Sequence, residues 1–142
     1  MTTKRYLEQI GRIEKLIHNK QLEMNKIREL CGSISVNTEQ ERVQTSNISD
    51  VTGRSGTELA AISKQIDFWF KKRETIISQI DRMEDPVIYE ILTYRYIQHM
   101  SVFDIMELMD RTERQIWNLL KRAHKEFEEI YGQNYLENSN MQ

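Results

Sequence analysis

The chain has few of the residues that interrupt helices or cross-link a fold. Its 142 residues include one proline, five glycines and one cysteine. Because proline and glycine are the residues that helices tolerate least, their scarcity favours long helices. The single cysteine, Cys31, excludes an internal disulfide and is typical of a protein from a reducing compartment.

Long apolar runs are also missing. No stretch is apolar enough over the length that a bilayer requires. The first residues, MTTKRYLEQIGRIEKL, alternate charged with apolar side chains and do not form the apolar segment of a secretion signal. We therefore expect a cytoplasmic protein.

A large charge excess of either sign is absent as well. Lys and Arg total 20 and Asp and Glu total 22, which gives a net charge of −2. The overall basic character of many nucleic-acid-binding domains is therefore missing. With 39% hydrophobic and 30% charged residues, the composition is typical of a globular protein and not of a disordered or membrane protein.

Two apolar patterns with steps of three and four residues indicate paired helices. The first covers residues 6–31 and is interrupted at Lys20, and the second covers residues 59–83 and is interrupted at Arg73. Each cation needs solvent or a carboxylate for its charged group. The acids that lie close to them in the sequence are Glu23 and Glu74.

These patterns predict an all-α fold that begins with a long antiparallel helical hairpin or coiled coil over residues 1–84. We expect its helices over about 4–31 and 57–83, joined by a polar connector, 32–56, that is rich in Ser, Thr, Asn and Gly. The exposed apolar side chains of such a hairpin leave a homo-oligomer open as an alternative to a monomer.

A second domain is predicted over residues 85–132. Asp85 is a suitable helix cap, and Pro86 suits the first position of a helix, where no backbone N–H is needed. Ser101 is positioned to cap a short helix over 102–109. A supporting helix followed by a short helix is the beginning of a helix-turn-helix unit.

The turn and the last helix complete this unit. Asp110 and Arg111 form the expected turn, and Thr112 with Gln115 matches a capping box at the start of the last helix. We therefore predict a C-terminal helix-turn-helix, whose second helix enters the major groove of DNA in proteins of this kind. Residues 133–142 are expected to be a flexible tail.

The polar side of the last helix carries the predicted DNA-binding residues. Arg, Gln and Asn can make bidentate contacts to guanine and adenine, and Lys and Arg neutralise phosphates. Residues 111–125 contain five Lys or Arg and one acid, a net charge of +4. The alternative is an ordinary amphipathic helix with a solvated face. The candidates are Arg111, Thr112, Arg114, Gln115, Trp117, Asn118, Lys121 and Arg122.

Residues for catalysis or for cofactor binding do not form any known pattern. The three histidines, His18, His99 and His124, have no Cys or acidic partner at the spacing of metal ligands. Gly53 and Gly56 match neither phosphate-binding loop. We therefore expect no enzyme, no metal site and no cofactor.

Residues 89–127, YEILTYRYIQHMSVFDIMELMD and RTERQIWNLLKRAHKEF, resemble region 4 of bacterial sigma factors. The resemblance implies that the helix starting near Thr112 reads a promoter element. The matching positions are Thr112, Glu113, Arg114, Gln115, Asn118 and the small Ala123. This chain departs from the family at Met106, where a small residue is usual, and at Asp110, where glycine usually makes the turn.

The whole layout is similar to phage and prophage late-gene transcription regulators of the ArpU and RinA type. That resemblance implies a regulator, an activator by preference, that binds double-stranded promoter DNA in the cytoplasm of a bacterial host. It also implies host RNA polymerase as a partner, through Tyr94, Tyr96 and the 102–109 helix.

Two other hypotheses remain. The first is a protein-interaction module, such as an anti-sigma or polymerase-binding protein, that does not bind DNA. The near-neutral charge and Trp117 favour it. The second is a phage DNA-packaging subunit, although such subunits usually place the DNA-binding part first in the chain.

Overall fold

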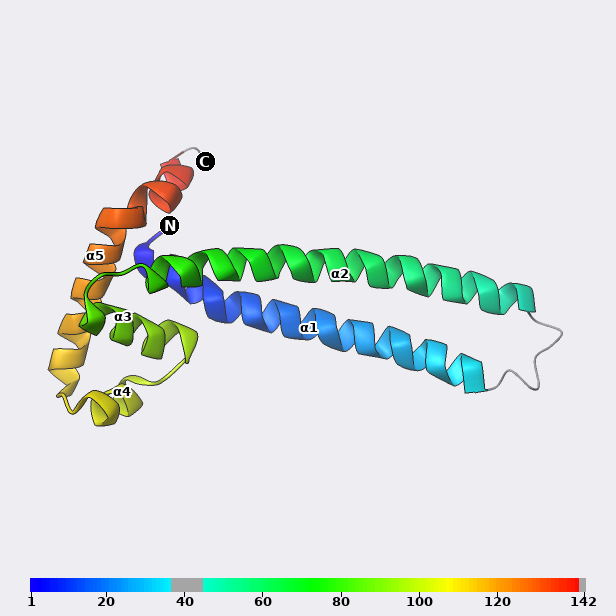
Figure 1. Cartoon of the computed structure of the whole chain (residues 1–142), viewed down its shortest axis with the longest axis horizontal. Helices are drawn as coiled ribbons and strands as arrows, with labels where there is room; N and C mark the ends of the chain where they lie inside the picture. The colour runs from blue at the N-terminus through cyan, green and yellow to red at the C-terminus, as the bar shows by residue number, and fades with distance from the viewer. Residues whose placement is uncertain (37–44, 141–142) are drawn as a thin grey trace. The chain divides into compact units, whose positions relative to one another are not determined.

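The part of the chain that the structure describes is predominantly helical and contains no strand, and the predicted all-α class is confirmed. The computed structural model describes the backbone of residues 1–36 and 45–140, and the side chains of residues 1–31 and 56–136. The elements, shown in Figure 1, are α1 (Thr3–Val36), α2 (Thr45–Asp81), α3 (Pro86–Leu92), the π-helical turn η1 (Thr93–Ile97), α4 (Val102–Met109) and α5 (Glu113–Asn140).

The predicted polar connector over 32–56 is longer than the structure allows. Helix α1 continues to Val36 and α2 already begins at Thr45, while residues 37–44 lie outside the described part. Ser, Thr and Asn lower helix propensity by less than about 1 kcal/mol each, and the segment has no proline. A polar composition therefore did not end the helices where we expected.

The chain divides into two compact units, and the division differs from the predicted one at residue 84. The terminal unit comprises Met1–Glu14 and Lys72–Gln142, and the middle unit comprises Lys15–Lys71. Both ends of the predicted hairpin domain thus belong with the C-terminal helices. The physical reason is the packing of α1 against α5 and the hydrogen bond between α1 and α2, described below.

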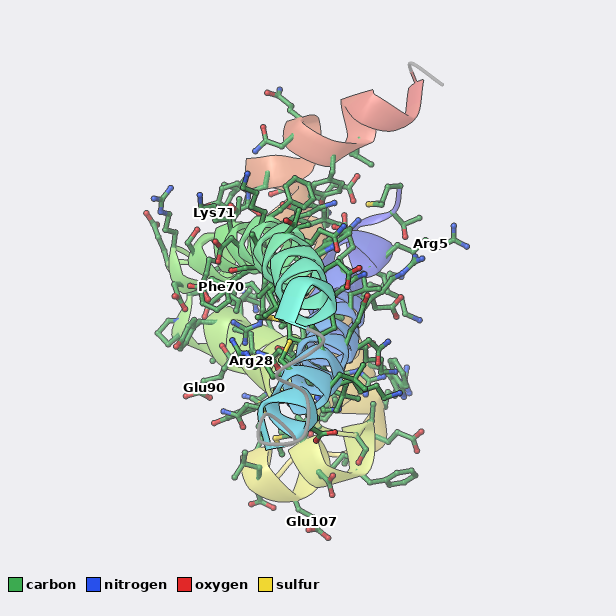
Figure 2. The ribbon with its side chains drawn as sticks, turned by 90° about the vertical axis from the view of Figure 1, so that its right-hand side faces the viewer. Arg5, Arg28, Phe70, Lys71, Glu90 and Glu107 are labelled. Atoms are coloured by element: carbon green, nitrogen blue, oxygen red, sulfur yellow. The ribbon has the colours of Figure 1, made fainter. Side chains whose placement is uncertain are left out.

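The middle unit consists of one segment each of α1 and α2, which lie side by side (Figures 1 and 2). Ile62 is buried, and Met24, Ile27 and Ile66 are half-buried. The predicted apolar pattern therefore marks the less exposed positions of both helices. As expected, the Lys20 ammonium pairs with a carboxylate, which is that of Glu23 at 3.1 Å.

The core of the terminal unit is built around Phe127 of α5, which is completely buried. Tyr6 of α1 lies 6.0 Å from it, measured between ring centroids, and stacks on Tyr135 of α5 at 4.3 Å. Tyr135 is only 4% exposed, and α5 extends to Asn140. The prediction of a flexible tail from residue 133 is therefore wrong, because the last turns of α5 carry an aromatic ring into this core.

Hydrogen bonds connect the same elements. The Tyr6 hydroxyl donates to Gln79 Oε1 of α2 at 2.7 Å, and the Thr3 and Tyr135 hydroxyls lie 2.7 Å apart. Thr3 and Gln79 are buried, and each has a partner, as buried polar groups require. Helix α1 is thereby tied to both α2 and α5 within the terminal unit.

Arg73, the cation that interrupts the second apolar pattern, is satisfied by carboxylates. Its Nε donates to Glu14 Oε1 at 2.9 Å, and its Nη1 donates to Glu74 Oε1 at 3.0 Å. The expected pairing with Glu74 is confirmed. Glu14 also binds the imidazole of His99, which has a left-handed backbone with φ of 56°.

The segment before α4 departs from a regular helix. As predicted, Asp85 caps α3, because its side chain accepts a hydrogen bond from Val87 N at 3.0 Å, and Pro86 is the first residue of the helix. The chain then widens into η1, where Gln98 N donates to Thr93 O at 2.9 Å, five residues back. No spacing in the sequence indicated this π-helical turn.

Replacing Tyr135 with alanine should lower the free energy of unfolding of the terminal unit by about 3 kcal/mol, because a buried aromatic ring is lost. Tyr135→Phe should cost only about 1 kcal/mol, because the ring stays and one hydrogen bond is lost. Urea denaturation of the full chain measures both. Equal stability of the alanine variant and the wild type would show that the end of α5 does not contribute to the core.

Candidate nucleic-acid interface

A short turn, residues 110–112, connects α4 to α5. Helix α4 is capped by Ser101, whose side chain accepts from Asp104 N at 3.2 Å. It ends at Asp110, which has φ of 53° and ψ of 52°. This left-handed conformation suits glycine best and aspartate better than most other residues. Asp110 can therefore make the turn without the glycine that is usual in sigma region 4.

The start of α5 is a reciprocal capping box, as predicted. Thr112 N donates to Gln115 Oε1 at 3.0 Å, and Gln115 N donates to Thr112 Oγ1 at 3.3 Å. A bidentate contact to adenine uses both the oxygen and the nitrogen of an amide side chain. Because the Gln115 oxygen already accepts in the cap, this residue fits a structural role better than a base-reading one.

The inner side of α5 is the predicted apolar stripe. It is buried at Ile116, Leu119, Leu120, Ala123 and Phe127. Ile130, further along α5, does not continue the stripe, because it is 57% exposed. The apolar stripe positions α5 on α3 and α4 and leaves its opposite side to solvent.

The solvent side carries a continuous row of polar side chains, which we call the outer ridge. Its members follow one another at four, three and four residues along the helix. Arg114 and Ala123 are nine residues apart, and at about 100° per residue they lie on opposite sides of α5. All members are exposed. The outer ridge consists of Arg114, Asn118, Lys121 and Lys125.

Trp117 lies on one flank of the outer ridge and is 47% exposed. Its indole Nε1 donates to Glu113 Oε1 at 3.4 Å, one helical turn earlier. A large apolar ring beside cations can contact a base or a protein partner. Arg111, in the turn, is also exposed, so every predicted DNA-binding residue is exposed in the structure.

Arg122 lies on the other flank and already has anionic partners. Its Nη2 is 3.1 Å from Asp85 Oδ2, and its Nε is 3.0 Å from Glu126 Oε1. The three formal charges sum to −1. The prediction that Arg122 holds a phosphate thus requires that a phosphate displace these carboxylates.

The outer face of α4 has a different character, which the sequence analysis did not identify. Phe103 is 69% exposed and Leu108 is 56% exposed. Between them lie Asp104 and Glu107, both exposed, and the Glu107 side chain projects outward in Figure 2. Carboxylates repel phosphates, so this face opposes close contact of α4 with a nucleic-acid backbone.

A buried polar pair holds η1 to α5. The hydroxyl of Tyr96 lies 2.5 Å from His124 Nε2, and Tyr96 is only 6% exposed. Burial, and to a lesser degree the nearby Glu8, raises the pKa of Tyr96 well above its usual value. The prediction that Tyr96 contacts RNA polymerase is wrong, because its side chain faces the interior.

Among residues 1–31 and 56–136, whose side chains the structure describes, no group of three His, Cys, Asp or Glu is placed to hold a metal ion. In the same part of the chain, no helix combines the length and apolar character needed to cross a membrane. The surface of α5 is therefore the site that remains to be explained.

Comparison of the chain with family models, with curated proteins and with solved structures found no match. The resemblance to sigma region 4 and to phage late-gene regulators thus stays a prediction. The function has to be argued from the geometry of α4 and α5.

The terminal unit should lose stability as the pH is lowered below about 6.5, the usual pKa of histidine. Burial, followed by the charge of Lys4, lowers the pKa of His124, while Glu8 raises it by a smaller amount. The unfolded chain therefore takes up a proton at a higher pH than the folded chain, and stability is lost as pH falls.

The matched control is His124→Gln, which keeps a polar group near Tyr96 but cannot titrate. Urea denaturation at a series of pH values should show a steeper loss of stability for the wild type than for the variant. Parallel profiles for the two proteins would mean that protonation of His124 does not oppose folding.

Proposed function

We propose that this chain is a sequence-specific DNA-binding transcription regulator of phage or prophage genes, which binds DNA through α5. The observation that carries the proposal is the exposed outer ridge, directly opposite the buried stripe of a helix that follows a left-handed turn and a capping box. In helix-turn-helix proteins, the residues near the start of the second helix contact base edges.

The members of the outer ridge suit different parts of DNA. Arg114 and Asn118, in the first two turns of α5, carry the groups that pair with guanine and adenine edges. Lys121 and Lys125, further along, are suited to phosphates, and Arg111 in the turn can reach the backbone on the other side. The two kinds of contact would set register and sequence preference together.

The charges of the chain favour only a modest affinity for DNA. The net charge of the chain is −2, and exposed Asp104 and Glu107 on α4 repel phosphates. A regulator of this kind gains affinity when a second DNA-binding subunit or a polymerase is attached. We therefore propose that it acts with host RNA polymerase, as an activator, or as a homo-oligomer joined through the middle unit.

The second candidate is a protein-interaction module that does not bind DNA. The exposed Phe103 and Leu108 on α4 favour it, because large apolar side chains in the centre of a surface patch are typical of protein interfaces. Trp117 on α5 is a further large apolar side chain exposed in the terminal unit. This candidate predicts that the α4 face, and not the outer ridge, carries binding.

Selection of DNA duplexes from a random pool tests the first candidate. We expect the wild type to enrich a motif, and Arg114→Ala to lose preference at one position at a cost of about 1–3 kcal/mol. Lys121→Ala should weaken binding to all sequences. It should also reduce the salt dependence of the affinity by the amount that about one phosphate contact contributes.

Lys64→Ala, at an exposed position of the middle unit, is the control and should bind as the wild type does. If no motif is enriched and no binding occurs at low salt, the DNA-binding proposal is rejected in favour of the protein-interaction module.

A further inference from the structure

Arg122 is predicted to bind phosphate, yet its surroundings do not resemble an open binding site. It follows Asn118 by one helical turn, and its side chain is 58% exposed, so it lies beside the outer ridge. Yet its guanidinium is bound by carboxylates from two different parts of the chain. Asp85 precedes α3 and Glu126 belongs to α5.

The two carboxylates occupy the same kind of position that a phosphate would take. A guanidinium offers five N–H groups and pairs with carboxylate and phosphate oxygens in similar geometry. Here Nη2 lies 3.1 Å from Asp85 Oδ2 and Nε donates to Glu126 Oε1 at 3.0 Å. An approaching phosphate therefore meets a cluster with a formal charge of −1 in place of a free cation.

We propose that Asp85 and Glu126 compete with phosphate for Arg122, and that Asp85 thereby lowers the DNA affinity of this chain. The inference rests on the proposed function and adds a regulatory element to the same surface. Asp85 is thus a residue that sets affinity without touching DNA, because it acts through Arg122.

The two oxygens of Asp85 have separate roles, which makes the proposal testable. Oδ1 accepts from Val87 N at 3.0 Å and caps α3, whereas Oδ2 faces Arg122. Asparagine caps helices about as well as aspartate does. Asp85→Asn therefore removes the negative charge and can keep the cap.

The size of the effect follows from the exposure of the pair. Exposed ion pairs are weak because water screens them, so the Arg122 side chain can change partners at little cost. We expect Asp85→Asn to raise the affinity for DNA by about threefold to fivefold at low salt. We also expect the affinity to depend more steeply on salt concentration, by the amount that about one additional phosphate contact contributes.

A structural role for the same contacts makes the opposite prediction. If Arg122 serves only to hold α5 against the start of α3, then loss of the Asp85 charge should lower stability and should not strengthen DNA binding. The two roles are therefore separated by measuring affinity and thermal stability on the same variant.

The experiment is fluorescence anisotropy of a labelled, mixed-sequence DNA duplex titrated with the full chain at several salt concentrations. The variants are Asp85→Asn, Arg122→Ala and the double variant. Glu129→Gln is the matched control, because it removes one exposed negative charge from α5 two turns beyond Arg122. It should raise affinity by less than Asp85→Asn does, because it frees no arginine.

When Arg122 is already replaced by alanine, Asp85→Asn should raise the affinity for DNA by no more than Glu129→Gln does. A double-mutant cycle of this kind isolates the part of an effect that depends on one partner. A gain above that of Glu129→Gln that persists without Arg122 overturns the inference alone. So does a stable Asp85→Asn protein that gains no more than Glu129→Gln does. A wild type that binds no DNA at low salt overturns the proposed function, and the inference with it.

Discussion

The structure of the terminal unit depends on the burial of Phe127 between the two ends of the chain. This ring, in the middle of α5, contacts Tyr6 of α1 as well as Tyr131 and Tyr135 of α5. One helix therefore serves two sets of partners, with α3 and α4 on its first half and the start of α1 on its second half. Because the inner side of its first half is buried, α5 offers its outer ridge and the flanks of that ridge to a ligand.

This arrangement separates the positive from the negative surface of the terminal unit. The cations of the outer ridge lie in the first half of α5, while Glu128 and Glu129 follow further along the helix. The outer face of α4 combines carboxylates with Phe103 and Leu108. A nucleic acid is favoured by the first surface and a protein by the second, so a regulator that binds both has a physical basis in this distribution.

Local patterns in the sequence predicted what local forces determine. The helical class, the caps at Asp85 and Ser101 and the capping box at Thr112 are confirmed, because each depends on residues within one or two turns. The end of α5 could not be predicted, because Tyr135 is ordered by Tyr6 from the other end of the chain. The division into units depends on the same distant contact.

The candidate site divides in the same way. Periodicity predicted which side of α5 is exposed. The contacts of Arg122 with Asp85 and of His124 with Tyr96 span 37 and 28 residues and left no local pattern. The measurement that tests the central claim most directly is NMR of the isotopically labelled chain titrated with duplex DNA. Our account predicts shift changes concentrated in residues 111–125. Changes concentrated in α4, or none at low salt, would contradict it.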